Sequence, residues 1–93
     1  MIQSFRNTDT EKVFLRQFAR KFPRDIQQRA FMKLNAIAAA IGLEDLRLPP
    51  SNRLEALKGD RQGQHSIRIN NQWRICFVWR KGHAEQVEIV DYH

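Results

Sequence analysis

The first part of the chain combines a short apolar run with aromatic residues at helical spacing. Residues 1–5 (MIQSF) are rich in apolar side chains and predict an opening strand. Thr8 and Glu11 have the spacing of a capping box, which is typical of a helix N-terminus. We therefore predict an amphipathic helix from Thr8 to about Lys21, because phenylalanines recur at every fourth position: Phe14, Phe18 and Phe22.

A second apolar stripe predicts a second helix. Pro23 breaks the first helix and fits the first turn of the next one, and Gly42 is a natural stop. Between them, apolar residues recur three and four positions apart: Ile26, Ala30, Leu34, Ile37 and Ile41. Two helices joined so tightly should form a hairpin. The Pro49–Pro50 pair that follows predicts an ordered loop without regular structure over residues 43–53.

From Leu54 onward apolar and polar residues alternate, which is the pattern of strands. Four segments show it: RLEALKG, GQHSIRI, WRICFVWR and EQVEIVDYH. The connections GDRQG, NNQ and KGH are short and rich in turn residues, so they predict hairpins. The predicted fold class is α+β, with one domain over residues 1–93. In it, an N-terminal strand and a helical hairpin pack on one face of a mainly antiparallel sheet of four to five strands.

The hairpin at residues 70–72 determines which arginines meet. Ile67 and Ile75 both need the core face, and a three-residue loop pairs them directly. The same register sets Arg68 opposite Arg74 on the other face of the sheet. Two facing guanidinium groups repel each other unless an anion lies between them. The pair therefore indicates either a phosphate clamp or two solvated arginines that lean apart.

Composition adds a bias toward an anionic partner. The chain has 16 Lys and Arg against 10 Asp and Glu, a net charge of +6. In so small a protein this favours nucleic acid, an acidic protein or both; the alternative is a basic surface that serves solubility alone. No apolar run has the length of a membrane span, and the first residues lack a signal-peptide core. We therefore expect a cytoplasmic protein without a membrane partner.

The sequence offers few groups for conventional catalysis. Its three histidines have no metal-ligand spacing, and the single cysteine, Cys76, gives no zinc pattern. This spacing therefore predicts no metal site. His65 is expected to pack in a strand and His83 to lie in a turn. Any chemistry must then come from basic residues and from the last three positions: Asp91, Tyr92 and His93.

Two stretches form a specific pair, RLEALKGDRQGQHSIRINNQWRICFVW and the terminal VEIVDYH. This pair closely resembles the HigB toxins of bacterial toxin–antitoxin modules, within the RelE/ParE superfamily, and the similarity extends over the whole chain. The resemblance implies a RelE-like fold and an endoribonuclease that needs no metal and no cofactor. Such a toxin enters the A site of a translating 70S ribosome and cuts the mRNA there. It also implies a HigA-like helix-turn-helix antitoxin, which neutralises the toxin and contacts operator DNA itself.

The resemblance assigns roles position by position. Lys58 and Arg74 match positions that the family uses for activity, as do the three terminal residues Asp91, Tyr92 and His93. The expected contacts to RNA are Arg68, Gln72 and Arg61. In the implied reaction, the 2′-hydroxyl of the RNA attacks its own adjacent phosphate. Cations at the phosphate oxygens stabilise the charge that develops there.

The acid and the base of this reaction are assigned from their chemistry. His93 is the candidate general acid, because an imidazole changes charge near neutral pH. Lys58 or Asp91 is the candidate base, and the opposite assignment fits the sequence equally well. Tyr92 offers a ring on which an RNA base stacks, or else it is an edge tyrosine that completes the core. Strand alternation aims His93 at the core face unless the strand twists or ends before it.

Two other functions fit the same pattern. A ParE-like relative has the same fold but inhibits DNA gyrase and needs no catalytic histidine. The terminal residues and the paired arginines argue against it. An RNA-binding module without catalysis would keep the basic surface, and only an activity measurement separates it. The sequence leaves open the codon preference, the toxin–antitoxin stoichiometry and whether the antitoxin covers the active site.

Overall fold

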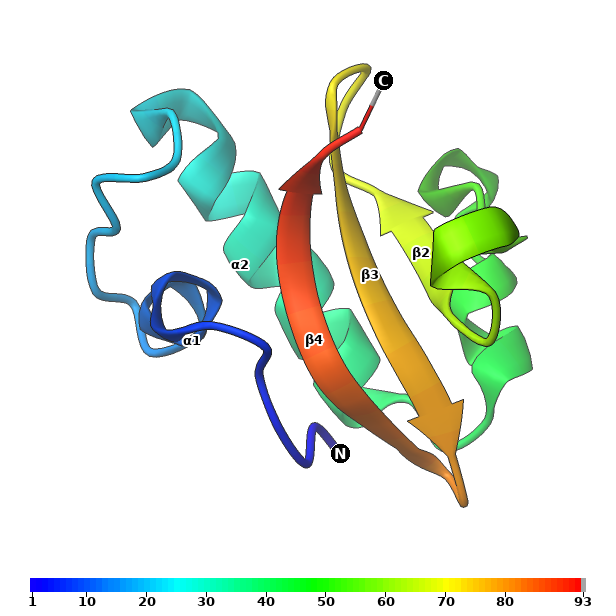
Figure 1. The fold of residues 1–93 in the computed structure, drawn as a ribbon. Helices are drawn as coiled ribbons and strands as arrows, with labels where there is room; N and C mark the ends of the chain where they lie inside the picture. The colour runs from blue at the N-terminus through cyan, green and yellow to red at the C-terminus, as the bar shows by residue number, and fades with distance from the viewer. Residues whose placement is uncertain (93) are drawn as a thin grey trace.

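The second half of the chain forms an antiparallel sheet in the computed structural model, which describes residues 1–92 (Figure 1). Within these residues, four strands lie in the order β1-β2-β3-β4, each paired with the next. Their bounds are β1 Glu55–Ala56, β2 His65–Arg68, β3 Trp73–Arg80 and β4 His83–Asp91. The predicted meander is confirmed, although β1 is reduced to two residues.

The N-terminal residues lie beside β4 and run parallel to it. Ile2 pairs with Ala84 and Phe5 with Val87 as isolated bridges, and the N–H of Gln3 donates to the Ala84 carbonyl at 2.7 Å. Ile2 and Phe5 both pack against the core. Residues three apart in a regular strand would face opposite sides, so the predicted opening strand is present as two bridges rather than a continuous strand.

The first helix, α1, spans Thr8–Phe14 and is much shorter than the predicted helix to Lys21. Its N-cap is Asn7 and not Thr8. The side chain of Asn7 accepts a hydrogen bond from the N–H of Thr10 at 2.8 Å. A cap must have an extended backbone while its side chain satisfies a free N–H of the first turn. Asn7 has that backbone, and Thr8 is already helical.

The second helix, α2, spans Arg24–Ala39 and lies behind the sheet in Figure 1. The first four residues of the predicted stripe are buried: Ile26, Ala30, Leu34 and Ile37. Ile41 is 86% exposed, so its place in the stripe is wrong. The helix ends at Ala39, and the extended backbone of Ala40 turns the chain away. The carboxylate of Asp45 then accepts the N–H of Ile41 at 2.9 Å.

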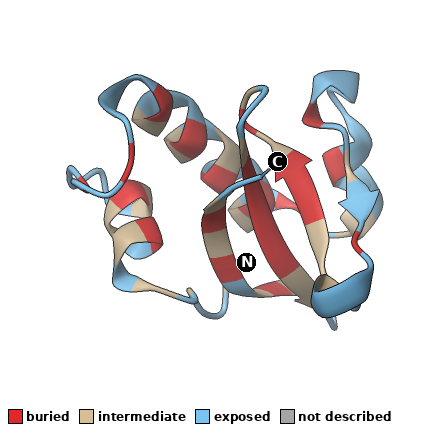
Figure 2. Cartoon of the chain, turned by 45° about the horizontal axis from the view of Figure 1, so that its top comes forward, coloured by how far each residue is buried: buried red, intermediate tan, exposed pale blue. Residues whose placement is uncertain are grey.

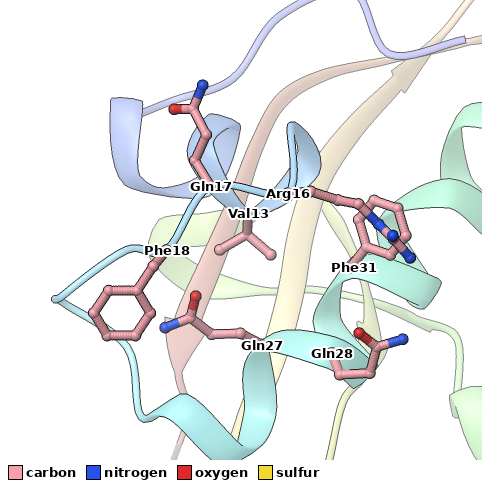
Figure 3. A pocket seen from close by; sticks show the side chains of 7 residues that line it. All are labelled: Val13, Arg16, Gln17, Phe18, Gln27, Gln28 and Phe31. Atoms are coloured by element: carbon pink, nitrogen blue, oxygen red, sulfur yellow. The ribbon is translucent and has the colours of Figure 1, made fainter.

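The connection between the helices leaves the helical path because it contributes to the core. Ala19 and Phe22 are buried, and the side-chain amide of Gln27 on α2 hydrogen-bonds to the backbone of both residues. Arg16 has a left-handed backbone angle (φ 63°) that ends α1 sharply. Phe18, which continued helical spacing would bury, is 53% exposed. Figure 3 shows it projecting from the rim of a hollow between the two helices.

The loop predicted without regular structure contains two 3-10 helices, η1 over Leu43–Arg47 and η2 over Pro50–Asn52. The buried side chain of Asn52 donates to two carbonyls of the loop, at 3.1 and 3.2 Å, and so ties it together. The prediction that this loop has no regular structure is therefore wrong, and at Pro50 the reason is simple. A proline fits the first position of a helical turn, where its missing N–H is not needed, and Pro50 begins such a turn.

One face of the sheet and the two helices enclose the hydrophobic core, and Figure 2 shows buried positions along the central strands and both helices. The main strand residues of this core are Ile67, Ile75, Phe77, Val87 and Ile89. The opposite face of the central strands carries Ser66, Arg74 and Cys76, all of them buried. Among residues 1–92, no helix combines the length and the apolar character needed to cross a membrane.

Candidate functional site

Arg74 is a buried cation on the sheet face opposite the helices. It lies in β3, and the residue is only 7% exposed. Its Nε donates to the hydroxyl of Ser66 at 2.8 Å, and its Nη2 donates to the carbonyl of Arg53 at 2.6 Å. Nη2 also lies 3.1 Å from a carboxylate oxygen of Glu55. A buried charge needs such partners, and together they fix the direction of the guanidinium group.

Arg68 is the cross-strand partner of Arg74, so the predicted register is confirmed. Its Nη2 donates to the side-chain oxygen of Asn71 in the β2–β3 turn. Each arginine therefore has its own partner, Asn71 for Arg68 and Glu55 for Arg74. These partners offset part of the repulsion between the two guanidinium groups, whose like charges stand at opposed positions on neighbouring strands.

A polar pocket of about 270 Å³ lies between these two arginines and the end of β4. The described residues that line it come from four parts of the chain: Arg53, Glu55, Arg68, Asn70, Asn71, Arg74 and Tyr92. The ring centroid of Tyr92 lies 5.7 Å from Cζ of Arg74, which is within cation–π range. The N–H of Tyr92 donates to the Gln72 carbonyl at 2.7 Å and holds the ring at this edge.

Asp91 and Gln72 stand next to the pocket at the same end of the sheet. Asp91 pairs with Trp73 across β3 and β4, and its carboxylate accepts a hydrogen bond from the Gln72 amide at 3.1 Å. Both residues are exposed. Neither is among the described residues that line the pocket. If they take part in the reaction as predicted, they act from beside the pocket.

Lys58 and Arg61 lie on the connection between β1 and β2. Lys58 is exposed and precedes a 3-10 turn, η3, over Gly59–Arg61. Arg61 is half-buried and forms an ion pair with Glu88 of β4 at 3.2 Å. Burial raises the pKa of the Cys76 thiol, and the positive charge of Arg61 acts in the opposite direction and lowers it. These contacts engage Arg61 in the fold, outside the group of described residues that line the pocket.

Two of the three histidines, His65 and His83, lie among the described residues. His65 lies in β2 as predicted and stacks against Phe77, with ring centroids 6.4 Å apart. His83 is the first residue of β4 rather than a turn residue, because it pairs with Arg80. His93, the candidate acid, lies outside the described residues. Within residues 1–92, no group of three or more His, Cys, Asp or Glu side chains is placed to hold a metal ion.

Sequence reasoning missed four residues that line the pocket, Arg53, Glu55, Asn70 and Asn71, and Glu55 matters most because it contacts Arg74. Its side chain is about half exposed (52%) and is the carboxylate that contacts Arg74. Glu55 pairs with Ser66, so it shares the face of the sheet that carries the arginine. Alternation could not reveal this, because β1 is only two residues long and has no period to read.

The chemistry available in the pocket follows from these groups. Two guanidinium groups can donate several hydrogen bonds to a tetrahedral oxyanion such as phosphate. The hydrogen bonds and the ion pair that the structure gives for Arg74 within residues 1–92 use Nε and Nη2, which makes Nη1 its remaining donor. Glu55 supplies a proton acceptor beside the cations, and Tyr92 supplies a ring and a hydroxyl.

Comparison with known proteins identifies the family. The family model described as the RelE-like toxin HigB of type II toxin–antitoxin systems matches residues 3–93. Toxin HigB-1 of Vibrio cholerae is 45% identical over 65 residues, which are 70% of this chain and 68% of that protein. Endoribonuclease HigB of Proteus vulgaris is 32% identical over 93 residues, which cover 100% of both chains.

Solved structures agree on the fold. YoeB in a YoeB–YefM complex from Staphylococcus aureus has a TM-score of 0.62 at 15% identity, and the match covers 100% of this chain and 98% of that one. The YoeB dimer from the same organism has a TM-score of 0.59 at 16% identity, covering 99% of this chain and 97% of that one. At such identities the likeness concerns the fold alone. The family match over nearly the whole sequence goes further: the chain belongs to the HigB toxins of type II toxin–antitoxin systems, which have the RelE-like fold.

Proposed function

We propose that this toxin is an endoribonuclease and that its reaction takes place at the pocket between Arg68, Arg74 and Tyr92. The observation that carries the proposal is the meeting of two cross-strand arginines and an aromatic ring in one polar pocket. Paired guanidinium groups are suited to a phosphate, and the ring gives an RNA base a surface for stacking. The full-length relative named Endoribonuclease HigB supports the same activity.

The proposed reaction is a transesterification within the RNA strand. The 2′-hydroxyl loses its proton and attacks the adjacent phosphorus, and the bond to the 5′-oxygen of the next nucleotide breaks. The products are a 2′,3′-cyclic phosphate and a 5′-hydroxyl, and the step needs no metal or cofactor. Negative charge grows on the phosphate oxygens in the transition state, where Arg74 and Arg68 stabilise it. Because Ser66 and Arg53 already hold Arg74, little reorganisation is needed.

Proton transfer needs an acid for the leaving 5′-oxygen and a base for the 2′-hydroxyl. We propose His93 as the acid. For the base, Glu55 joins Lys58 and Asp91 as a candidate, and its place in the pocket wall beside Arg74 favours it. A phosphate that binds Arg74 would compete with Glu55 for the guanidinium group. The carboxylate would then be available to accept a proton.

We also propose that cleavage requires the 70S ribosome with a message in its A site. The acid–base groups proposed for the reaction are few: Glu55 in the described lining of the pocket, and His93, Lys58 and Asp91 as the other candidates. The ribosome would hold the message in an attacking geometry and so contribute much of the acceleration. The isolated toxin is expected to cut free RNA negligibly.

The proposed partner is a HigA-like helix-turn-helix antitoxin that neutralises the toxin and itself contacts operator DNA. Membership in a toxin–antitoxin family supports a partner of this kind. The net charge of +6 favours an acidic docking segment on that partner.

Primer extension on a message translated in a purified system tests the proposed function. We expect codon-phased cuts with the intact toxin, and no cuts when ribosomes are left out. His93→Ala should lose them, whereas Glu85→Gln, at the far end of β4, should keep them. A gyrase-trapping assay with the same protein tests the alternative, inhibition of DNA gyrase. Intact messages together with trapped gyrase would overturn the nuclease and favour ParE-like inhibition instead.

A further inference from the structure

A groove of about 740 Å³ lies between α2 and the β2–β3 turn. It adjoins the arginine pocket, because three residues of the turn region line both hollows: Arg68, Asn70 and Asn71. On the other wall, Arg29 and Lys33 extend from α2 into the same groove. An RNA strand bound in the arginine pocket would reach this groove by crossing the β2–β3 turn, whose residues line both hollows.

The two α2 cations are held in place but keep donors to spare. Arg29 donates through Nη1 to the Ile69 carbonyl at 3.2 Å, and the ammonium of Lys33 donates to the side-chain oxygen of Asn52. Asn52 is buried and is itself anchored to the preceding loop. An ammonium has three donors and a guanidinium group five, so both side chains can bind a further acceptor.

Electrostatics in the groove favours an anion. Arg29 and Lys33 are one turn apart on α2, where like charges repel each other. Burial, and after it the charge of Arg29, lowers the pKa of Lys33. With Arg68, three cations line the groove against a single carboxylate, Asp25, among the residues that the structure describes. An anion bound between the cations would relieve both the repulsion and the cost of desolvating Lys33.

We propose that Arg29 and Lys33 form a second phosphate subsite, which binds the backbone of the RNA strand flanking the phosphate at Arg74. This inference rests on the proposed function for the identity of its ligand. The shared wall at Arg68 favours the message strand itself over an unconnected anion. The polar wall formed by Asn70 and Asn71 suits a phosphodiester backbone better than an apolar peptide face.

The test compares two double variants with the same loss of charge. In the first, Arg29→Gln and Lys33→Gln remove the two α2 cations and keep hydrogen-bonding side chains. In the control, Arg80→Gln and Lys81→Gln remove one arginine and one lysine at the β3–β4 end of the sheet, opposite to the β2–β3 turn in Figure 1. The probe is a single-stranded oligoribonucleotide with a 2′-deoxy sugar at its cleavage site, so that it binds without reacting.

Fluorescence anisotropy over a range of salt concentrations gives the number of phosphate contacts. Each contact to a single strand contributes about 0.7 to the slope of log K against log salt. The groove variant should therefore lose about 1.4 from this slope, which is on the order of 20-fold in affinity at 0.1 M salt. The control variant should keep the wild-type slope. Equal slopes in the two variants would overturn the subsite.

A charge-retaining variant, Arg29→Lys with Lys33→Arg, guards against simple misfolding. It should restore the salt slope, and failure to restore it despite wild-type unfolding behaviour would also contradict a phosphate subsite. A wild-type slope for the groove variant, combined with weakened binding of an acidic antitoxin peptide, would assign the groove to a protein partner instead.

Single-turnover cleavage on programmed ribosomes separates this inference from the proposed function. The groove variant should need more toxin for half-saturation but reach the wild-type rate within about twofold, because its cations do not contact the reacting phosphate. If the wild type cleaves nothing, the nuclease assignment fails, and the oligonucleotide slopes still decide whether the groove binds a phosphate backbone.

Discussion

Arg74 combines two properties that rarely occur together, a permanent charge and nearly complete burial. The hydroxyl of Ser66, the carbonyl of Arg53 and the carboxylate of Glu55 offset the cost of that burial. In the proposed reaction, such a constrained guanidinium group would already be oriented when the phosphate binds. Preorganised donors contribute more to catalysis than flexible surface arginines, since they do not have to be ordered during the reaction.

Glu55 gives the first prediction at this scale. Glu55→Gln keeps the shape and one oxygen that can face Arg74, but it cannot take a proton. If Glu55 is the base, the single-turnover rate on programmed ribosomes should fall about 100-fold or more. In the wild type, the cleavage rate should rise with pH as the base loses its proton, and this rise should be absent in Glu55→Gln. Glu85→Gln, which alters the ion pair with Arg80 instead, is the matched control. An unchanged rate and pH profile would leave the base to Lys58 or Asp91.

The arginine pair was predictable from sequence because the register of a hairpin follows from its apolar residues. Ile67 and Ile75 had to share the core face, and that fixed Arg68 opposite Arg74. Glu55 was not predictable in the same way. The contact between Glu55 and Arg74 depends on how a two-residue strand joins the sheet edge. Arg53 contributes a backbone carbonyl, and a pattern of side chains does not predict backbone contacts.

At the scale of elements, helix ends are decided by tertiary contacts as much as by spacing. The phenylalanine spacing predicted a helix to Lys21, but the side chain of Gln27 binds the backbone at Ala19 and Phe22. That segment therefore enters the core in a non-helical form. The stripe on α2 was predicted correctly up to Ile37, because a long amphipathic pattern is dominated by burial.

The cap of α1 can be tested directly. Asn7→Ala removes the acceptor for the Thr10 N–H and should lower the free energy of unfolding by about 1 kcal/mol. Thr8→Ala is the control, because Thr8 is the cap that the sequence pattern favours but it lies inside the helix. Chemical denaturation with both variants distinguishes the two caps. A larger loss for Thr8→Ala would show that the helix begins one residue later.

The end of α2 carries a pH-dependent contribution. Hydrogen bonds from the N–H groups of Gly42 and Ile41 lower the pKa of Asp45. Because the folded-state pKa is below the unfolded one, the carboxylate stabilises the fold above the unfolded-state pKa. This contribution is lost as pH falls through the folded-state pKa. Asp45→Asn should therefore lower Tm at neutral pH, and the gap to the wild type should close in acid.

Circular dichroism melts from neutral to strongly acidic pH measure this gap. Glu44→Gln, the neighbouring exposed carboxylate on η1, is the control for a general change in surface charge. A gap for Asp45→Asn that stays constant over the whole pH range would mean that its hydrogen bonds do not depend on ionisation.

At the scale of the molecule, the helices cover one face of the sheet and leave the other to polar residues. The α+β plan followed from the switch between helical and alternating patterns, and it is confirmed. What the sequence could not give is the position of the hollows on the surface. The arginine pocket and the α2 groove meet at the β2–β3 turn because of how three separate segments pack. The net charge of +6 indicates a basic surface but not where on the molecule it is hollowed.

The most direct test of the account is the effect of Arg74→Lys on cleavage. Lysine keeps the charge but lacks the planar fork that reaches Ser66, Arg53 and a phosphate at once. Unfolding measurements would first establish the fraction of folded protein, and Arg80→Lys would serve as the control. Single-turnover cleavage on programmed ribosomes should then fall about 100-fold to 1,000-fold per folded molecule. A folded Arg74→Lys toxin that cuts at the wild-type rate would contradict the assignment of this pocket as the site of phosphate chemistry.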